Sequence, residues 1–280
     1  MNESELFRAT PWPVLRNTVE SLLFQHRPYT CYGFGEADVT AAIAAIKAYQ
    51  KELRIAVSFH AFVLHCLTQA AMEHPEVLTY RHRRKLITFK TVDMATVVDQ
   101  RLPDGVRLPV GYTVREAQTK RLAEINWELR QAIRASQLDS EALRLRRRVA
   151  HWPKPLRRLV SWRIGRDPFL LRRYHGTIGL TNLQSPGFHK PFYALPPNIF
   201  TLSVAIGTIV ERPVPEVAKP NAVKKIVCLS AGADHAVIDG MALSRFAQRL
   251  VQLLEAAAGL DGKFLQDTRR LMQHTKEQQS

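Results

Sequence analysis

Apolar residues recur along this chain at two spacings, which predict a mixture of helices and strands. Spacings of three and four residues predict helices over 14–25, 38–53, 59–74, 119–135 and 240–257. Ser58 is placed to cap the third of these helices and Pro75 to end it. Short β-rich runs predict strands over 85–89, 92–99, 177–182, 200–210 and 223–231, with a turn at 102–106. This alternation predicts an α+β fold with one main sheet.

The composition is that of a globular chain large enough to bury a sizeable core. Apolar residues make up 46% of the 280 positions, which suits a single domain over 1–262 followed by a polar tail over 263–280. The polar, acidic start of the chain is unlike a signal peptide, and no apolar run reaches the ~20 residues of a membrane span. Cys31, Cys66 and Cys228 lack metal-ligand spacing and are interpreted as reduced thiols, so we expect a cytoplasmic protein.

The basic charge of the chain is concentrated in one segment. The formal net charge is +15, and residues 144–173 contribute +10 of it, because ten arginines and Lys154 face Asp167 alone. Trp152 and Trp162 are interleaved with these arginines. Such a segment binds nucleic acid, an anionic membrane or an acidic protein, or it is simply a solvated surface. No stacking or groove-binding motif accompanies the arginines, so we expect no specific nucleic-acid partner.

The stretch "ADHAVIDG" at residues 233–240 is the clearest candidate for chemistry. His235 follows the apolar run of a predicted strand, Asp239 lies one helical turn later, and Gly240 opens a predicted helix. A histidine works as a general base when its ring is neutral and fixed in place, and a loop braced by a carboxylate can fix it. Taken alone, the same pattern also fits a histidine with a structural role.

Several segments share one family resemblance. "LSAGADHAVIDGMALSRFAQRLVQLLE" (229–255) resembles the catalytic domain of the 2-oxoacid dehydrogenase acyltransferases and the related chloramphenicol acetyltransferases. "GTIGLTNLQSPG" (176–187), "VDMATVVDQRLPDGVRLPV" (92–110) and "LRNTVESL" (15–22) are similar to other elements of that family, in the family's order. The resemblance covers nearly the whole chain apart from about 140–175 and the tail. It implies a two-layer sandwich in which helices cover a mixed sheet.

The resemblance also implies the reaction groups. His235 matches the general base of the family, and Thr181 matches a serine that donates a hydrogen bond to the tetrahedral oxyanion. The family forms trimers whose active sites lie between subunits, so we expect a homotrimer here. Without the resemblance, Thr181 also fits an ordinary β-branched strand position.

Four more residues are assigned to the site: Asp239 is grouped with the catalytic residues, and Arg16, Asn182 and Gly240 give structural support. Asp239 is expected to be a structural carboxylate, paired with Arg16, that holds the motif loop. From the residues alone, Asp239 also fits a helix cap and Arg16 a surface charge. The positions expected to support the site without touching the reaction are Arg16, Asn182 and Gly240.

The expected function is the transfer of an acyl group between a thioester and a thiol, hydroxyl or amine. Coenzyme A is the expected donor or acceptor, with no metal, and the sequence assigns no residues to its binding. The family matches begin within about 15 residues of Met1, which leaves no lipoyl domain, so we expect no lipoyl group on this chain. Two residues on the oxyanion side depart from the family. Thr181 stands where the family has serine, and Gly179 stands where it has threonine.

The basic segment, an insert at about 140–175, admits several interpretations. It could attract the phosphates of coenzyme A, dock an acidic carrier or lipoyl protein, or lie peripherally on an anionic membrane. It could also be a packed surface element with no partner. The alternative function is a catalytically inactive scaffold of the same fold that binds an acidic protein or a membrane through residues 144–173.

Overall fold

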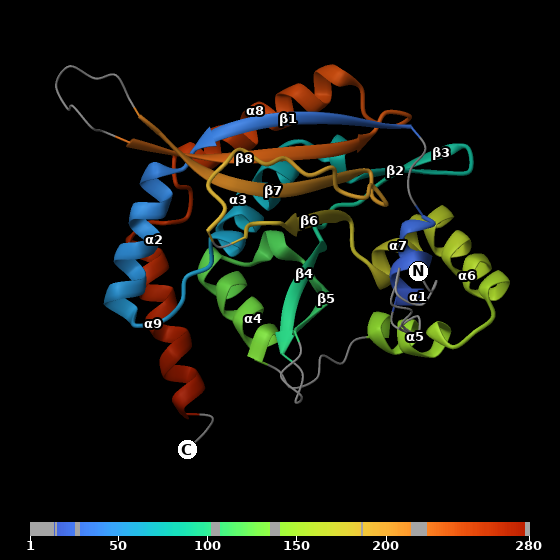
Figure 1. The fold of residues 1–280 in the computed structure, drawn as a ribbon, viewed down its shortest axis with the longest axis horizontal. Helices are drawn as coiled ribbons and strands as arrows, with labels where there is room; N and C mark the ends of the chain where they lie inside the picture. The colour runs from blue at the N-terminus through green and yellow to red at the C-terminus, as the bar shows by residue number, and fades with distance from the viewer. Residues whose placement is uncertain are drawn as a thin grey trace, which may run out of the picture.

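A six-stranded mixed sheet forms the centre of the structure, a computed structural model that describes residues 14, 16–25, 29–101, 107–134, 141–185, 187–213 and 223–277 (Figure 1). The strands lie in the order β1-β8-β7-β6-β4-β5. Neighbouring strands are antiparallel except at β7/β6 and β6/β4, which are parallel. The sheet and its helices confirm the predicted α+β class with a mixed sheet.

The bounds of the elements are as follows. The strands are β1 (Thr30–Asp38), β2 (Thr79–His82), β3 (Lys85–Thr88), β4 (Met94–Arg101), β5 (Arg107–Val114), β6 (Ile178–Asn182), β7 (Leu202–Pro213) and β8 (Val223–Asp234). The α-helices are α1 (Arg16–Leu23), α2 (Thr40–Leu53), α3 (Phe59–Glu73), α4 (Leu122–Arg134), α5 (Glu141–Ala150), α6 (Lys154–Arg166), α7 (Pro168–Tyr174), α8 (Gly240–Glu255) and α9 (Gly262–Glu277). Two short 3₁₀ helices are η2 (Pro75–Leu78) and η3 (Ala117–Thr119).

One face of the sheet is covered by helices, and the main core lies between the two layers. Helix α3 is buried along most of its length and packs against α4 and α8, while α8 contacts β1 and α4 contacts β4. Ile178, Leu180, Val204 and Ile206 point from the sheet into this core. Over the opposite face of β7 and β8 runs the segment 187–200, which is held by hydrogen bonds from Ser230 and to Thr208 (Figure 1).

The local predictions for helix α3 are confirmed. The Ser58 side chain accepts a hydrogen bond from the Ala61 backbone N–H at 3.3 Å, and the helix ends at Glu73, before Pro75. Strand β1 was not predicted, because Gly33 and Gly35 interrupt its β-rich residues. It forms because it pairs with β8 along its whole length, from Thr30↔Asp234 to Asp38↔Ile226. The predicted turn at 102–106 lies outside the described residues.

Helices α1, α5, α6 and α7, here called the helical unit, form a separate lobe at one side of the sheet (Figure 1). The prolines of the basic segment begin two of its helices, α6 and α7, and Asp167 caps α7 by accepting hydrogen bonds from the backbone N–H groups of Phe169 and Leu170. A second, smaller core joins the lobe to the hairpin β2–β3 and to the segment before β7. Its buried members are Tyr80, Phe89, Ile164, Leu171, Ile199 and Phe200.

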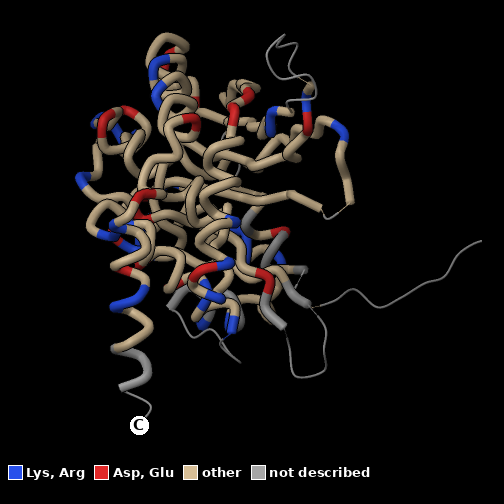
Figure 2. The backbone as a smooth tube through the Cα atoms, turned by 90° about the vertical axis from the view of Figure 1, so that its left-hand side faces the viewer, with Lys and Arg blue, Asp and Glu red and all other residues tan. Residues whose placement is uncertain are grey.

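On the side of the molecule away from the helical unit, acidic and basic residues are interspersed (Figure 2). Many of them pair across helices there, as in Arg269–Glu52 and Arg249–Glu73. Among the described residues, no helix has both the length and the apolar character needed to cross a membrane.

The polar tail predicted over 263–280 contains most of helix α9. Helix α9 packs against α4 and α2, with Phe264 2% exposed and Thr268 1% exposed. Asp267 accepts two hydrogen bonds from the Arg121 guanidinium, at 2.9 and 3.0 Å. The helix packs because its few apolar residues lie on one face, which composition alone concealed. Residues 262–277 therefore belong to the folded domain.

The packing of α9 predicts a large effect from Phe264→Ala. Removing a buried phenylalanine lowers the free energy of unfolding by about 3–5 kcal/mol, because burial is lost and a cavity remains. Urea denaturation measures this loss, with Lys263→Ala, at an exposed position of the same helix, as the control. A loss below about 1 kcal/mol for Phe264→Ala would contradict a packed α9.

Candidate active site

His235 lies directly after β8, at the end of the sheet where β1 begins. Its backbone N–H donates to the Tyr29 carbonyl at 2.8 Å, which continues the pairing of β1 with β8 by one residue. The Asp234 carbonyl accepts hydrogen bonds from the N–H groups of Val237 and Ile238 at 3.0 and 2.9 Å, so the chain turns sharply here. The imidazole is exposed and has no hydrogen-bond partner among the described residues. The backbone is fixed while the ring is accessible.

Asp239 caps the helix that follows the motif. Its Oδ1 accepts a hydrogen bond from the Ala242 N–H at 3.0 Å, so the helix-cap interpretation is the one that the structure displays. Arg16 begins helix α1, but its side chain lies outside the described part of the chain, so its pairing with Asp239 stays a prediction. A Cβ added at Gly240 would meet nothing within 4 Å, so packing within one chain does not require glycine there.

Thr181 lies near the end of β6 on the face of the sheet that helices do not cover. Because strand residues alternate and Ile178 and Leu180 enter the main core, the Thr181 side chain points to the opposite face. It is half-buried, and its hydroxyl has no hydrogen-bond partner among the residues described. The adjacent Asn182 accepts a hydrogen bond from the Gln184 N–H at 3.0 Å, which shapes the turn after the strand.

The sheet register keeps Thr181 and His235 apart within one chain. Thr181 pairs with Ala205, and Ala205 pairs with Ser230, so Thr181 lies two strands away from a residue five positions before His235. Two strand spacings and five residue rises place their Cα atoms about 20 Å apart. Both groups must lie within hydrogen-bond distance of one reacting thioester if they act together. A single chain therefore cannot assemble this pair into one site.

Gly179 is explained by packing against the second core. A Cβ at this position would lie 2.8 Å from Cδ2 of Phe200 and 3.1 Å from Oγ of Ser203. Phe200 is one of the buried residues that join the helical unit to the sheet. The departure from threonine at Gly179 thus makes room for Phe200 beside the strand that carries Thr181.

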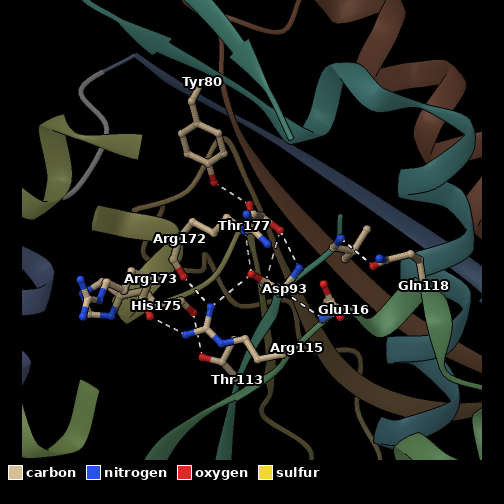
Figure 3. A network of polar contacts seen from close by, with 11 residues as sticks. Tyr80, Asp93, Thr113, Arg115, Glu116, Gln118, Arg172, Arg173, His175 and Thr177 are labelled. Atoms are coloured by element: carbon tan, nitrogen blue, oxygen red, sulfur yellow. Dashed lines mark hydrogen bonds and ion pairs between the residues drawn. The ribbon is translucent and has the colours of Figure 1, made fainter. Parts of the chain in front are cut away.

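A buried carboxylate directly before β4, beside the start of β6, is the feature that the sequence did not reveal (Figure 3). Asp93 is 2% exposed, and its Oδ2 accepts hydrogen bonds from Arg172 Nε at 2.9 Å and from Arg115 Nη1 at 3.2 Å. Its Oδ1 accepts from the Glu116 N–H at 2.9 Å. The charge on Asp93 is therefore balanced by two arginines from different parts of the chain.

The backbone of Asp93 holds Thr177 and Ile178, where the strand that carries Thr181 begins. The Asp93 N–H donates to Thr177 Oγ1 at 2.9 Å, and its carbonyl accepts from the Thr177 N–H at 2.7 Å. Tyr80 donates from its hydroxyl to the Thr177 carbonyl at 2.5 Å. Arg115 in turn donates to the carbonyls of Arg172 and Arg173, where α7 ends (Figure 3). The network thus joins the sheet, the start of β6 and the basic segment.

His60 is a half-buried histidine whose ring lies beneath the sheet, on the side that the helices cover. It lies in α3, and its Nε2 is 2.6 Å from Oγ1 of Thr96 in β4. Thr96 pairs with Leu180 of β6. Burial lowers the pKa of His60 to about 4, because the low-dielectric interior disfavours the charged ring. The ring is neutral near pH 7 and supports the sheet one residue away from Thr181.

Some of the charge of the basic segment pairs with acids of the same chain. Arg172 pairs with Asp93, Arg163 with Asp167, and Glu20 of α1 receives both Lys154 and Arg157. Asp167 is already counted in the segment's +10, so Asp93 and Glu20 lower it by two, to +8. Within the described ranges, no cluster of His, Cys, Asp and Glu side chains could hold a metal ion.

One protein family model matches most of this chain. The family model for the 2-oxoacid dehydrogenases acyltransferase (catalytic domain) matches residues 12–144 and 175–260, which include His235 and Thr181. The match omits residues 145–174, which form most of the helical unit. No curated protein sequence matches this chain significantly.

The similar solved structures share the fold at low sequence identity. A probable dihydrolipoamide acetyltransferase from Listeria monocytogenes superposes with a TM-score of 0.64 and 18% identity, over 90% of this chain and 95% of that one. The dihydrolipoamide acetyltransferase of Azotobacter vinelandii superposes with a TM-score of 0.63 and 19% identity, over 93% and 97% of the two chains. A chloramphenicol acetyltransferase gives 0.50 and 14%, over 87% and 96%. The predicted chloramphenicol acetyltransferase-like fold is confirmed.

The Asp93 network predicts that Asp93→Ala strongly destabilises the protein. Removing the buried carboxylate leaves the Glu116 N–H and the two guanidinium groups without their acceptor, which lowers the free energy of unfolding by about 1–3 kcal/mol. The control is Asp267→Ala, which breaks the surface pair with Arg121, a residue 67% exposed in its side chain, and costs at most about 1 kcal/mol. Chemical denaturation compares the two variants. Equal losses would show that Asp93 is no more important than a surface carboxylate.

Proposed function

Because the chain belongs to the family of 2-oxoacid dehydrogenase acyltransferase catalytic domains, we propose which reaction groups its acyltransferase activity uses. The donor is an acyl-coenzyme A thioester, and the acceptor is a thiol, hydroxyl or amine. His235 is the general base and Thr181 is the oxyanion donor. The observation that carries the proposal is that both groups are held by strand ends, are accessible, and have no side-chain hydrogen-bond partner among the described residues.

The spacing of catalytic residues in a similar enzyme supports these roles. The structure of the Azotobacter vinelandii acetyltransferase was used to study a serine, a histidine and an asparagine in its catalytic mechanism. In that enzyme the serine precedes the histidine by 52 positions, and the asparagine follows it by four. In this chain Thr181 precedes His235 by 54 positions, and Asp239 follows it by four. A threonine hydroxyl can donate the same hydrogen bond as a serine hydroxyl.

The separation of His235 and Thr181 supports an active site between two copies of the chain. About 20 Å lies between them in one chain, whereas a tetrahedral intermediate requires both within a few Å of one carbonyl. A neighbouring copy in a closed ring can bring its Thr181 to the His235 of the first copy. We expect a homotrimer, in which three such sites form.

The reaction proceeds by direct attack in a ternary complex. The neutral ring of His235 takes the proton from the acceptor while the acceptor atom bonds to the thioester carbonyl carbon. The carbonyl oxygen becomes an oxyanion that accepts the hydrogen bond from Thr181. When the intermediate collapses, the carbon–sulfur bond breaks, and His235 returns its proton to the leaving thiolate. No acyl group is attached to the protein at any stage.

The loop that presents His235 is held by its backbone and by the helix cap of Asp239. The hydrogen bond to Tyr29 and the turn around Asp234 fix where the residue leaves the strand. The cap ties the start of α8 to the same turn. These contacts hold the catalytic position without touching the substrate, so Asp239 has a positioning role in this mechanism.

The two reaction groups predict a distinct pattern of activity loss. Thiol release from acyl-coenzyme A should fall by about 10²–10⁴ in kcat for His235→Ala and by about 10²–10³ for Thr181→Val. Thr181→Ser keeps a hydroxyl and should retain most activity. The control is His151→Ala, because His151 is an exposed histidine outside the site.

All variants should keep the assembly size and melting temperature of the wild type. If wild-type protein releases thiol and His235→Ala releases it at the same rate, His235 is not the base. If the wild type turns over no thioester at all, the inactive-scaffold function is favoured instead.

A further inference from the structure

Helix α6 of the helical unit places large apolar side chains on its exposed side. Its buried positions are Arg157, Ser161 and Ile164. Arg157 has Glu20 as a charged partner, at 3.4 Å, and its Nε and Nη1 atoms are buried without a hydrogen bond among the described residues. An amphipathic helix at a water-exposed surface normally turns its large apolar side chains inward. The apolar side chains on the exposed side of α6 therefore point to contact with something other than water.

The outward face combines large apolar side chains with arginines. Leu156, Leu159 and Trp162 are 49%, 58% and 44% exposed, and they lie three residues apart along one side of the helix. Arg158 and Arg166 are exposed between them and carry no ion pair among the described residues. We call these five residues the α6 face. Its charge is positive, and none of its members is acidic.

The arginines of the α6 face lie against aromatic rings. The Arg166 guanidinium is 4.9 Å from the centre of the Trp162 ring, and that of Arg158 is 5.4 Å from the centre of the exposed Phe24 ring, directly after α1. Trp152, which precedes α6, is also exposed. Stacked arginine and tryptophan at the edge of an aliphatic stripe are typical of side chains at a lipid–water interface, where the ring meets the acyl region and the cation meets phosphate.

We propose that the α6 face binds the surface of an anionic lipid bilayer. The exposed leucines and Trp162 would enter the boundary between headgroups and acyl chains, and Arg158 and Arg166 would contact lipid phosphates. A bilayer needs no matching pocket, and this face is the outer side of a helix on a protruding lobe (Figure 1). An acidic protein would instead need complementary shape around its anchor residues. The face lies within residues 145–174, which the family match omits, so it is an addition to the catalytic domain.

Vesicle flotation tests this proposal with the full chain. Wild-type protein should float with vesicles of mixed phosphatidylcholine and phosphatidylglycerol, and should not float with pure phosphatidylcholine. Leu159→Asp should weaken the partition coefficient about ten- to hundredfold, since a leucine that enters the bilayer is replaced by a charge that anionic lipid repels. Arg158→Gln combined with Arg166→Gln should weaken it by about tenfold or more.

The controls separate the lipid surface from other occupants and from the catalytic proposal. Ile133→Asp places the same charge at an exposed isoleucine of α4, 48% exposed, and should bind vesicles like the wild type. His235→Ala should also bind like the wild type, because the α6 face is independent of the chemistry. Bromine-labelled lipids should quench tryptophan fluorescence in the wild type, and Trp162→Phe should remove much of that quenching.

Three results would overturn the proposal. The first is equal flotation with neutral and anionic vesicles, or none with either. The second is a change of assembly mass in Leu159→Asp by sedimentation, which would assign the face to a second copy. The third is binding to soluble polyglutamate that is as tight as binding to vesicles and insensitive to Leu159→Asp, which would indicate an acidic protein.

Discussion

Strand register in the central sheet is the constraint on which the account of this protein depends. The pairing of β6 with β7 and of β7 with β8 fixes Thr181 and His235 at different points of one rigid sheet. No side-chain rotation spans the about 20 Å between their Cα atoms. The same hydrogen bonds that make the sheet stable thus prevent one chain from forming the site alone. In the proposed mechanism, catalysis therefore depends on self-association.

The region around Thr181 is stabilised from several directions. Asp93 joins the start of β6 to Arg115 and to Arg172 of the basic segment, while Phe200 fills the space left by Gly179. The helical unit is therefore anchored to the sheet through a buried ion pair and an apolar core. Arg172 contributes to this attachment, whereas Arg158 and Arg166 belong to the exposed α6 face. Net charge alone could not distinguish these two uses.

The sequence predicted those helices and site residues that have a local residue pattern. Helical spacing located α3 and α8, and the motif and family resemblance singled out His235. Strand β1 was missed because its glycines weaken the local signal and its stability comes from long-range pairing with β8. The partnership of Asp93 with Arg172, 79 positions later, has no local signature at all. The structure describes Asp239 as a helix cap, whereas its expected pairing with Arg16 stays a prediction.

A complementation experiment tests the shared active site most directly. His235→Ala and Thr181→Val chains, each nearly inactive alone, are co-expressed with different tags, and the mixed assemblies are purified through both tags. If each site takes His235 from one copy and Thr181 from its neighbour, every mixed trimer has one intact site of three, and thiol release recovers to about one third of wild type. If both residues of a site come from the same chain, every site in the mixture lacks one of them. Activity that stays at the level of the single variants would contradict the account.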